Sequence, residues 1–268
     1  MTQDGGDGAL LTARHGGALV LCINRPHVAN AVDAATSYAI DRALRAAEAD
    51  ETVGAVILTG AGTRAFCSGM DMKEAARDGV GRGLVPGRGF CGLTEQRFAK
   101  PLIAAVNGAA VAGGFEIALA CDIIVAAESA VFGLSEVKRG LVAYAGGVQR
   151  LARGAPRSLA MEIILTGAPV SAQRLHDVGL VSRVTPSASL MDEALDMARA
   201  VLANGWTALH HAKGLFEASL DMRLDEALAY GHSVGAKILG RAEAVEGVAA
   251  FAGHRAAQFA ATARKREG

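Results

Sequence analysis

Residues 102–122 read LIAAVNGAAVAGGFEIALACD. The first five are an apolar run typical of a buried strand, and a loop rich in alanine and glycine separates them from a second apolar run, 115–120, that is typical of a buried helix. Gly113 and Gly114 precede this helix, so their backbone N–H groups lie at or near a helix N-terminus, which favours an anion. The glycines can equally serve close packing of strand on helix. The order of strand, glycine loop and helix indicates an α/β protein.

Short apolar runs alternate with helical stretches through the first two thirds of the chain. Between the first two runs, apolar residues over 34–47 recur at helical spacing with charged residues between them, which predicts an amphipathic helix. The alternation itself is typical of an α/β architecture. The expected strands cover residues 19–23, 53–59, 102–106, 123–126 and 180–184.

The last third of the sequence predicts helices alone. All six prolines fall at or before Pro186, and the residues that follow are mostly those that lose least on entering a helix. Ser189 and Asp192 fit a capping box that opens one helix, and Gly205 is placed to end it. Further helices are expected over 207–220, 222–239 and 241–252.

The composition of the 268 residues excludes several classes of protein. With 51% hydrophobic and 20% charged residues, the chain is not intrinsically disordered. Its 27 Lys and Arg balance its 27 Asp and Glu, so no overall basic field would collect nucleic acid or an anionic membrane. No apolar run approaches the roughly 20 residues that span a bilayer, and no secretory leader opens the sequence. We therefore expect a cytoplasmic protein.

Cysteine and histidine spacing argues against a metal site. The four cysteines are widely separated and form no C-x-x-C pair, which favours buried free thiols over a zinc site or a disulfide scaffold. Among the seven histidines only His210 and His211 are adjacent, and neighbours in sequence point to different sides of a helix. No metal is expected.

A second glycine loop, GAGTRAFCSGMDMKE, covers residues 60–74 after the expected strand 53–59. Its opening matches the relaxed dinucleotide-binding pattern, but that pattern needs a helix that starts at the third small residue, Ala65, and here Phe66 and further residues intervene. No Gly-Lys-Ser/Thr follows, so a P-loop is excluded. With two glycine loops, each after a strand, an anion site becomes more favoured than packing alone.

Residues 78–92, DGVGRGLVPGRGFCG, show no sustained period and are crowded with glycine. This composition predicts a mobile loop of the kind that often covers a site.

Two glutamates are candidates for acid and base chemistry. Glu116 stands in an otherwise apolar stretch, where an isolated carboxylate would be costly to desolvate, although it could also stabilise a helix dipole. Glu136 precedes Lys138 and Arg139 and, taken alone, reads as a solvated or ion-paired residue. Together in one pocket, the two could hold a water and divide acid and base roles.

The chain resembles the enoyl-CoA hydratase/isomerase, or crotonase, superfamily over nearly its whole length. The segments that carry the resemblance are Asn24-Arg25-Pro26 through Asn30-Ala31, AFCSGMDMK at 65–73, NGAAVAGGFEIALACD at 107–122, FGLSEVKRGL at 132–141 and GGVQRL at 146–151. The resemblance implies a spiral of ββα units over residues 1–200, followed by a helical region, 201–268, that builds homotrimers or homohexamers. ANAVDAATS, GRGFCGLTE and AVEGVAAFAGHR resemble the carnitinyl-CoA dehydratase branch most.

The resemblance also implies roles for the loops and the glutamates. The backbone N–H groups of Met70 and Gly113 would form an oxyanion hole for the enolate of an acyl-CoA thioester. Glu116 would deprotonate the water that attacks C3, and Glu136 would deliver a proton to C2, so the presence of both favours an enoyl-CoA hydratase. Coenzyme A is then part of the substrate, and no separate cofactor is implied. The implied substrate-binding residues are Arg25, Ala65, Met70, Asp71, Met72, Lys73 and Gly113, with Lys73 or Arg25 near the phosphates.

Other activities within the superfamily fit the same motifs. A Δ3,Δ2-enoyl-CoA isomerase needs one glutamate and no water, and a carnitinyl-CoA dehydratase would offer aromatic faces such as Phe90, Phe115 and Tyr144 to a trimethylammonium group. A non-catalytic acyl-CoA-binding or RNA-binding member is a further alternative. Where the family usually has prolines, this sequence has Ser135 and Ala143, and Tyr144 takes a position that is commonly acidic or small.

Overall fold

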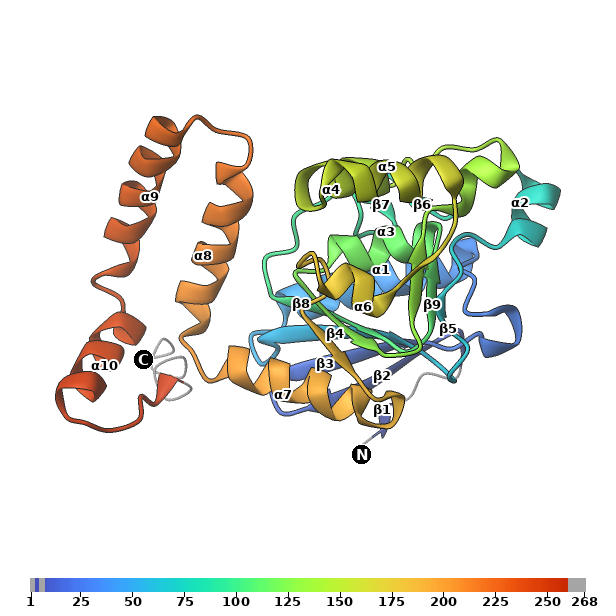
Figure 1. The fold of residues 1–268 in the computed structure, drawn as a ribbon. Helices are drawn as coiled ribbons and strands as arrows, with labels where there is room; N and C mark the ends of the chain where they lie inside the picture. Colours follow the sequence, from blue (N-terminus) through green and yellow to red (C-terminus); the bar gives the residue numbers. More distant parts are fainter. Residues whose placement is uncertain (1–2, 5–7, 260–268) are drawn as a thin grey trace. The chain divides into compact units, whose positions relative to one another are not determined.

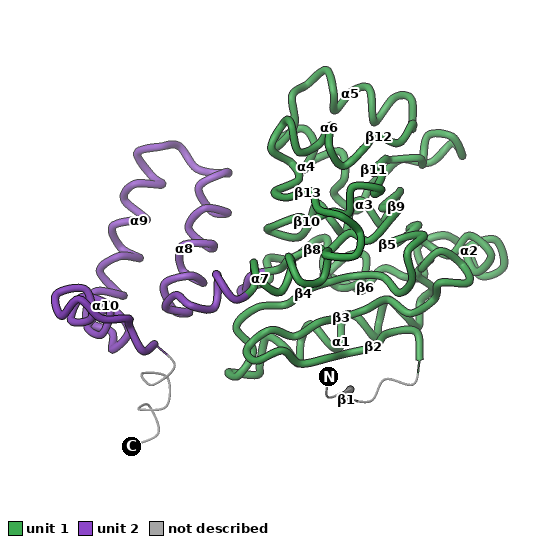
Figure 2. Tube along the Cα trace, turned by 60° about the horizontal axis from the view of Figure 1, so that its bottom comes forward, with its two compact units in different colours: residues 1–98, 102–198 green, residues 99–101, 199–268 purple. Residues whose placement is uncertain are grey.

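The computed structural model describes residues 3–4 and 8–259. The chain forms two compact units, one of residues 1–98 and 102–198 and one of residues 99–101 and 199–268 (Figure 2). The first unit combines sheets with helices, which confirms the expected α/β class, and the second is helical.

Two sheets organise the first unit (Figure 1). The larger has the strand order β1 (Gln3–Asp4), β2 (Leu10–His15), β3 (Ala18–Ile23), β4 (Ala55–Gly60), β8 (Leu102–Val106), β10 (Ile123–Ala127) and β13 (Arg183–Thr185). From β3 to β13 its strands run parallel, and β1, β2 and β3 are antiparallel. The smaller has the order β12 (Val170–Ser171), β11 (Val131–Gly133), β9 (Ala109–Val111) and β5 (Ala65–Cys67).

A repeated strand–strand–helix unit links the two sheets. Strands β4, β8 and β10 lie in the larger sheet, and each is followed by a short strand of the smaller one, β5, β9 or β11. The helix that comes next is α2 (Met72–Asp78), α3 (Gly113–Ala120) or the 3-10 helix η2 (Ser135–Arg139). Because β4 and β8 are buried along their whole length, their sequences are continuous apolar runs. The ββα repeat is thereby confirmed.

The remaining helices of the first unit cover these sheets. Helix α1 (Ala34–Ala49) confirms the predicted amphipathic helix, and the Asp33 side chain caps it by accepting a hydrogen bond from the Thr36 N–H. Helices α4 (Gly147–Gly154) and α5 (Arg157–Thr166) lie beyond α3, on the side away from the larger sheet (Figure 1). The other elements are the 3-10 helices η1 (Pro26–Val28) and η3 (Ser187–Ser189), helix α6 (Ala172–His176) and helix α7 (Leu190–Leu202), whose last four residues belong to the second unit.

Two local predictions were wrong. The strand expected over 180–184 begins only at Arg183, because the N–H groups of Leu180 and Val181 bond to the carbonyl of Leu175 in the turn that closes α6. The capping box is not formed either, since Ser189 lies in η3, which runs directly into α7, and Gly205 precedes the next helix.

The segment over 78–92 is more regular than its composition predicts. It contains a short antiparallel hairpin of β6 (Leu84–Val85) and β7 (Gly89–Phe90). Val85, Phe90 and Cys91 are buried, so apolar side chains anchor a segment in which glycine supplies the turns.

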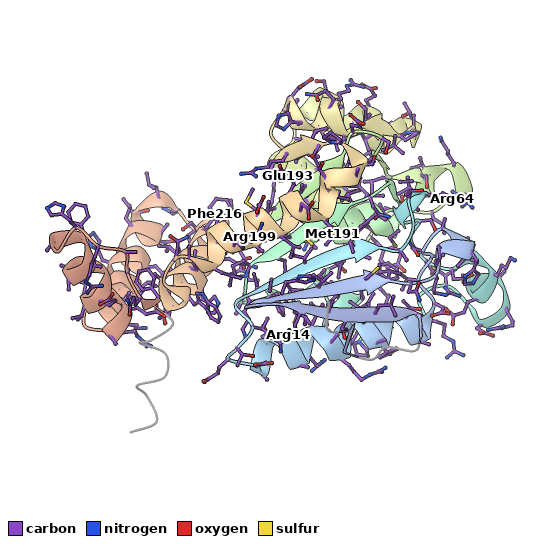
Figure 3. All side chains as sticks on the ribbon, turned by 90° about the horizontal axis from the view of Figure 1, so that it is seen from below. Arg14, Arg64, Met191, Glu193, Arg199 and Phe216 are labelled. Atoms are coloured by element: carbon purple, nitrogen blue, oxygen red, sulfur yellow. The ribbon has the colours of Figure 1, made fainter. Side chains whose placement is uncertain are left out.

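The second unit consists of helices that confirm the predicted ones within two residues. These are α8 (Trp206–Ser219), α9 (Leu224–Ile238) and α10 (Ala242–Ala252). Large apolar side chains remain exposed on them, including Phe216 on α8 (Figure 3), Leu224 on α9 and Phe251 on α10. Within the described part of the chain, no helix is both long and apolar enough to cross a membrane.

Gly114 gives the fold a sharp test. A Cβ at this position would overlap the backbone carbonyl of Cys67 in β5, whereas nothing lies within 4 Å of a Cβ at Gly214 in α8. We expect Gly114→Ala to lower the free energy of unfolding by about 3 kcal/mol or more. Gly214→Ala, the matched control, should be neutral or stabilise by roughly 0.5–1 kcal/mol. Denaturant titration measures both, and equal effects of the two substitutions would contradict this packing.

Candidate active site

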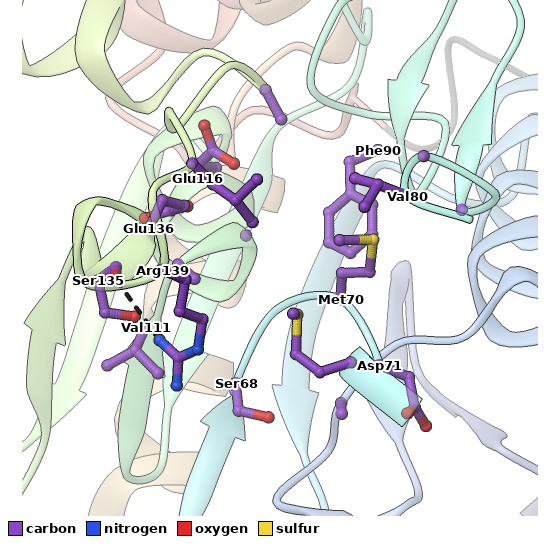
Figure 4. Close-up of a pocket in the computed structure, with 18 of the residues that line it drawn as sticks. Ser68, Met70, Asp71, Val80, Phe90, Val111, Glu116, Ser135, Glu136 and Arg139 are labelled. Atoms are coloured by element: carbon purple, nitrogen blue, oxygen red, sulfur yellow. Dashed lines mark hydrogen bonds between the residues drawn. The ribbon is translucent and has the colours of Figure 1, made fainter. Parts of the chain in front are cut away.

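A cavity of about 360 Å³ in the first unit brings together five separate segments of the chain (Figure 4). The lining residues are Val28, Ala31, Ser68, Met70, Asp71, Met72, Lys73, Val80, Gly81, Gly83, Leu84, Phe90, Val111, Ala112, Gly113, Glu116, Ser135, Glu136, Arg139, Leu141, Val142, Tyr144 and Ala145. Most of them are apolar, so the few charged groups stand in a partly desolvated setting.

Two backbone donors meet at this cavity. Gly69 has a φ of +88°, and a Cβ there would lie 2.9 Å from the Gly113 nitrogen, so only glycine allows this approach. Val32 bridges Met70: its N–H donates to the Gly69 carbonyl at 2.8 Å, and its carbonyl accepts from the Asp71 N–H at 2.9 Å. The Met70 N–H therefore faces away from Val32.

Neither donor is used within the described part of the chain. The Gly113 N–H is the first of α3 and has no partner within the helix, and the Met70 N–H bonds to no described group. Ala112, which precedes α3, has a φ of 52°, a conformation that costs a non-glycine residue about 1–3 kcal/mol and is frequent at functional sites. The structure thus brings Met70 and Gly113 to one cavity as two open N–H donors.

Glu116 lies in the first turn of α3 with only 4% of its surface exposed. Its Oε1 accepts a hydrogen bond from the Gly147 N–H at 3.0 Å. Burial raises the pKa of Glu116 to about 7, and the charge of Glu136 also raises it, while the bond from Gly147 opposes the shift. A carboxyl with a pKa near neutrality can take up and release a proton at ordinary pH.

Glu136 lies in η2 on the same side of the cavity as Glu116 (Figure 4). Burial raises the pKa of Glu136, and the positive charge of Arg139 lowers it by less. Its Oε2 is buried, and no group of the described residues bonds to it. A buried carboxylate oxygen without a partner is poised for a water or a substrate hydroxyl.

The remaining predicted binding residues divide into two groups. Asp71, Met72 and Lys73 line the cavity, and Asp71 also caps α2 through the N–H groups of Lys73 and Glu74. Arg25 and Ala65 do not line it.

Arg25 and Ala65 have structural contacts instead. Arg25 forms ion pairs with Asp33 at 2.9 Å and with Asp71 at 3.0 Å, which ties the second glycine loop to the start of α1. Ala65 is buried in β5, and its carbonyl accepts from the Asn30 amide at 2.7 Å. Their predicted contact with a substrate therefore gains no support from the cavity.

The aromatic candidates divide in the same way. Phe90 and Tyr144 line the cavity, whereas Phe115 is fully buried and packs on Phe132 with ring centroids 5.3 Å apart. Burial and the charge of Glu116 raise the pKa of the Tyr144 phenol, which keeps it a hydrogen-bond donor.

Sequence reasoning missed Gly147 as the partner of Glu116. The signal was the Gly146-Gly147 pair, at which α4 begins, because an N–H at the start of a helix has no partner within that helix. Among the described residues, no group of three or more His, Cys, Asp or Glu side chains could hold a metal ion.

Comparison with known proteins places the chain in a family. The sequence model of the enoyl-CoA hydratase/isomerase family matches residues 13–262. The chain belongs to this family. Its fold is therefore that of the crotonase superfamily, as the motifs predicted, and the chain is an enzyme of the hydratase/dehydratase type.

Named relatives are similar over most of their length. The carnitinyl-CoA dehydratase of Salmonella paratyphi A is 39% identical over 253 residues, which cover 92% of this chain and 96% of that protein. The crystal structure of enoyl-CoA hydratase EchA1 from Mycobacterium marinum matches with a TM-score of 0.89 and 42% identity, covering 93% and 98% of the two chains. The structure of a carnitinyl-CoA dehydratase from Mycobacterium avium 104 matches with a TM-score of 0.75 and 40% identity, and the match covers 91% of this chain and 96% of that one.

The raised pKa of Glu116 predicts a pH-dependent stability. Because native Glu116 keeps its proton to about pH 7 and an unfolded glutamate only to about 4.5, the native state binds more protons between these values, and its free energy of unfolding falls as pH rises through them. Glu116→Gln lacks this titration. Its free energy of unfolding, compared with that of wild type, should therefore rise by up to about 3 kcal/mol as the pH increases from about 4.5 to about 7. Denaturant titrations at pH 5 and pH 8 measure the difference.

The exposed Glu128, outside the cavity, offers the matched control. Glu128→Gln should differ from wild type by the same amount at both pH values. A Glu116→Gln difference that is equally constant would show that the carboxyl is not desolvated.

Proposed function

We propose that this protein catalyses the reversible addition of water to the double bond of a 2-enoyl-CoA thioester. The observation that carries the proposal is the arrangement of Glu116 and Glu136 in one cavity with two open backbone donors, Met70 and Gly113. Family membership and the relatives named as enoyl-CoA hydratases support it.

In the proposed reaction, the thioester oxygen accepts hydrogen bonds from the Met70 and Gly113 N–H groups. These donors stabilise the negative charge that moves onto this oxygen when water attacks C3, by about 3–4 kcal/mol each. Glu116 takes the proton of the attacking water, and Glu136 gives a proton to C2 as the enolate collapses. The water supplies the hydroxyl on C3 and leaves its proton on Glu116, while Glu136 supplies the proton on C2; Glu116 then loses a proton to solvent and Glu136 takes one up, which restores the starting state. The mutual repulsion of the two carboxyls favours one protonated and one ionised group.

The segment Met70–Lys73 is the proposed path of coenzyme A. Met72 and Lys73 are exposed at the cavity, so the lysine ammonium can meet phosphates while Met72 covers apolar parts of the carrier. We propose no cofactor beyond the coenzyme A of the substrate.

The exposed apolar side chains of the C-terminal helices support a homotrimer or homohexamer, and a cytoplasmic location fits the absence of a spanning helix in the described residues.

The carboxyls test the mechanism. Glu116→Gln and Glu136→Gln should each lower kcat for crotonyl-CoA hydration by about 10²–10⁴-fold, because each removes one proton-transfer group. Glu128→Gln, the control, should keep kcat within two-fold. Loss of the ultraviolet absorbance of the conjugated thioester measures the rate. A Glu116→Gln enzyme with wild-type kcat would refute the assignment.

Isotope labelling distinguishes a hydratase from an isomerase. Reaction in heavy-oxygen water should place the label on C3 of the product if water is added. A double-bond shift without label would favour a Δ3,Δ2-enoyl-CoA isomerase in place of the hydratase.

Carnitinyl-CoA dehydratase is the second candidate. The 39% identical relatives carry this name, and the cavity presents two aromatic rings, Phe90 and Tyr144, whose faces could hold a trimethylammonium group. If this is the substrate, kcat/KM for crotonobetainyl-CoA should exceed that for crotonyl-CoA, and Tyr144→Leu should reduce the ratio by about 2- to 30-fold, the range of a cation–π contact. A ratio that favours crotonyl-CoA and is unchanged by Tyr144→Leu would exclude this candidate.

A further inference from the structure

One wall of the cavity is a segment that helix α1 holds in place. Residues 80–94, here called the wall segment, contribute Val80, Gly81, Leu84 and Phe90, among others, to the lining. Its hairpin is too short to be stable alone, so its position depends on what it is fastened to.

Three polar side chains of α1 bond to this segment. The Tyr38 hydroxyl donates to the Leu84 carbonyl at 3.5 Å, and Ser37 and Asp41 make shorter bonds. The Ser37 hydroxyl donates to the Gly83 carbonyl at 2.5 Å and accepts from the Cys91 N–H at 3.0 Å. Asp41 Oδ1 accepts from Arg88 Nε at 2.6 Å. These bonds fix the wall segment before the hairpin, at Gly83, after it, at Cys91, and in its turn, at Arg88.

Asp41 has a second arginine partner that does not belong to the wall segment. Arg45, one turn further along α1, donates to the other carboxylate oxygen at 2.9 Å, and its side chain is 54% exposed. The Arg88 side chain is 15% exposed. One carboxylate thus binds a half-buried arginine from the wall segment and an exposed arginine from its own helix.

The wall segment touches an oxyanion donor. A Cβ at Gly113 would lie 2.8 Å from Phe90 Cε1, so the phenyl ring packs directly on the backbone of the first residue of α3. The Phe90 N–H in turn donates to Thr94 Oγ1 at 2.9 Å, and the Thr94 carbonyl accepts from Arg150 at 2.9 Å. A shift of the wall segment would therefore reach Gly113 through Phe90.

The Asp41–Arg88 pair is poorly suited to stabilising the fold. A buried ion pair often contributes little net stability, because desolvation offsets the attraction. Arg88 also has a buried Nη2 that bonds to no described group, which is a further cost. What the pair does supply is a fixed position.

We propose that Ser37 and the Asp41–Arg88 ion pair are positioning residues, which hold Phe90 against Gly113 and so set the alignment of the Gly113 N–H and the acyl size that the cavity accepts. This inference rests on the proposed function. None of the three side chains lines the cavity, so they act through the wall segment.

The test compares the two arginine partners of Asp41. Arg88→Gln should lower kcat for crotonyl-CoA about ten-fold with a smaller effect on KM, because a donor displaced by a fraction of an ångström loses alignment in the transition state. It should also narrow the difference in kcat/KM between four- and eight-carbon 2-enoyl-CoA esters. Arg45→Gln, the matched control, should change kcat less than two-fold, and Arg88→Lys should restore part of the loss. Ser37→Ala, expected to lower kcat about three-fold, serves if Arg88→Gln does not fold.

Hydrogen exchange and infrared spectroscopy provide readouts besides turnover. Amides over 83–92 should exchange at least about ten-fold faster in Arg88→Gln but not in Arg45→Gln, and the carbonyl stretch of bound crotonyl-CoA should shift less from its free value. The proposal is overturned if folded Arg88→Gln keeps the wild-type kcat, acyl preference and carbonyl stretch. It is also overturned if Arg45→Gln changes these quantities as much as Arg88→Gln does. If wild type binds crotonyl-CoA without turnover, the proposed function fails, and the carbonyl stretch still decides the positioning role. A wild type that binds no enoyl-CoA ester refutes both.

Discussion

The close approach of Gly69 to the N-terminus of α3 is the contact on which the site depends. A side chain at Gly69 would collide with the Gly113 nitrogen, so this approach exists only because the residue is glycine. It places at one cavity the N–H groups of Met70 and Gly113, which bond to no group of residues 3–4 and 8–259. The ββα repeat supplies the frame: each loop follows a short strand, β5 or β9, and these two strands are paired neighbours in the smaller sheet.

Burial then sets the chemistry of the carboxyls at the same cavity. Glu116 loses water by lying in an apolar helix, and the Gly147 N–H compensates only part of that loss, so its pKa reaches about 7. Glu136 adds repulsion. A carboxyl that can exchange a proton near neutral pH thus lies at a cavity whose lining residues include no histidine. The cost appears as lower stability at high pH.

The sequence predicted what depends on local pattern and missed what depends on distant partners. Continuous apolar runs identified the buried strands β3, β4, β8 and β10, and helical spacing identified α1. Periodicity did not locate the short strands β5, β9 and β11, because three residues are too few to show a period. The family motifs pointed to Met70, Gly113, Glu116 and Glu136, and all four line the cavity. Arg25 and Ala65 do not line the cavity. They bond instead to residues far along the chain, Arg25 to Asp71 and Ala65 to Asn30, and such distant contacts cannot be read from a local motif.

A crystal structure with a bound, unreactive acyl-CoA thioester would show directly whether the two N–H groups hold the thioester. The thioester oxygen should lie about 2.7–3.1 Å from both the Met70 and the Gly113 nitrogen, with C3 facing the Glu116 carboxylate. A thioester oxygen outside hydrogen-bond reach of both nitrogens, with the acyl chain still in the cavity, would contradict this prediction.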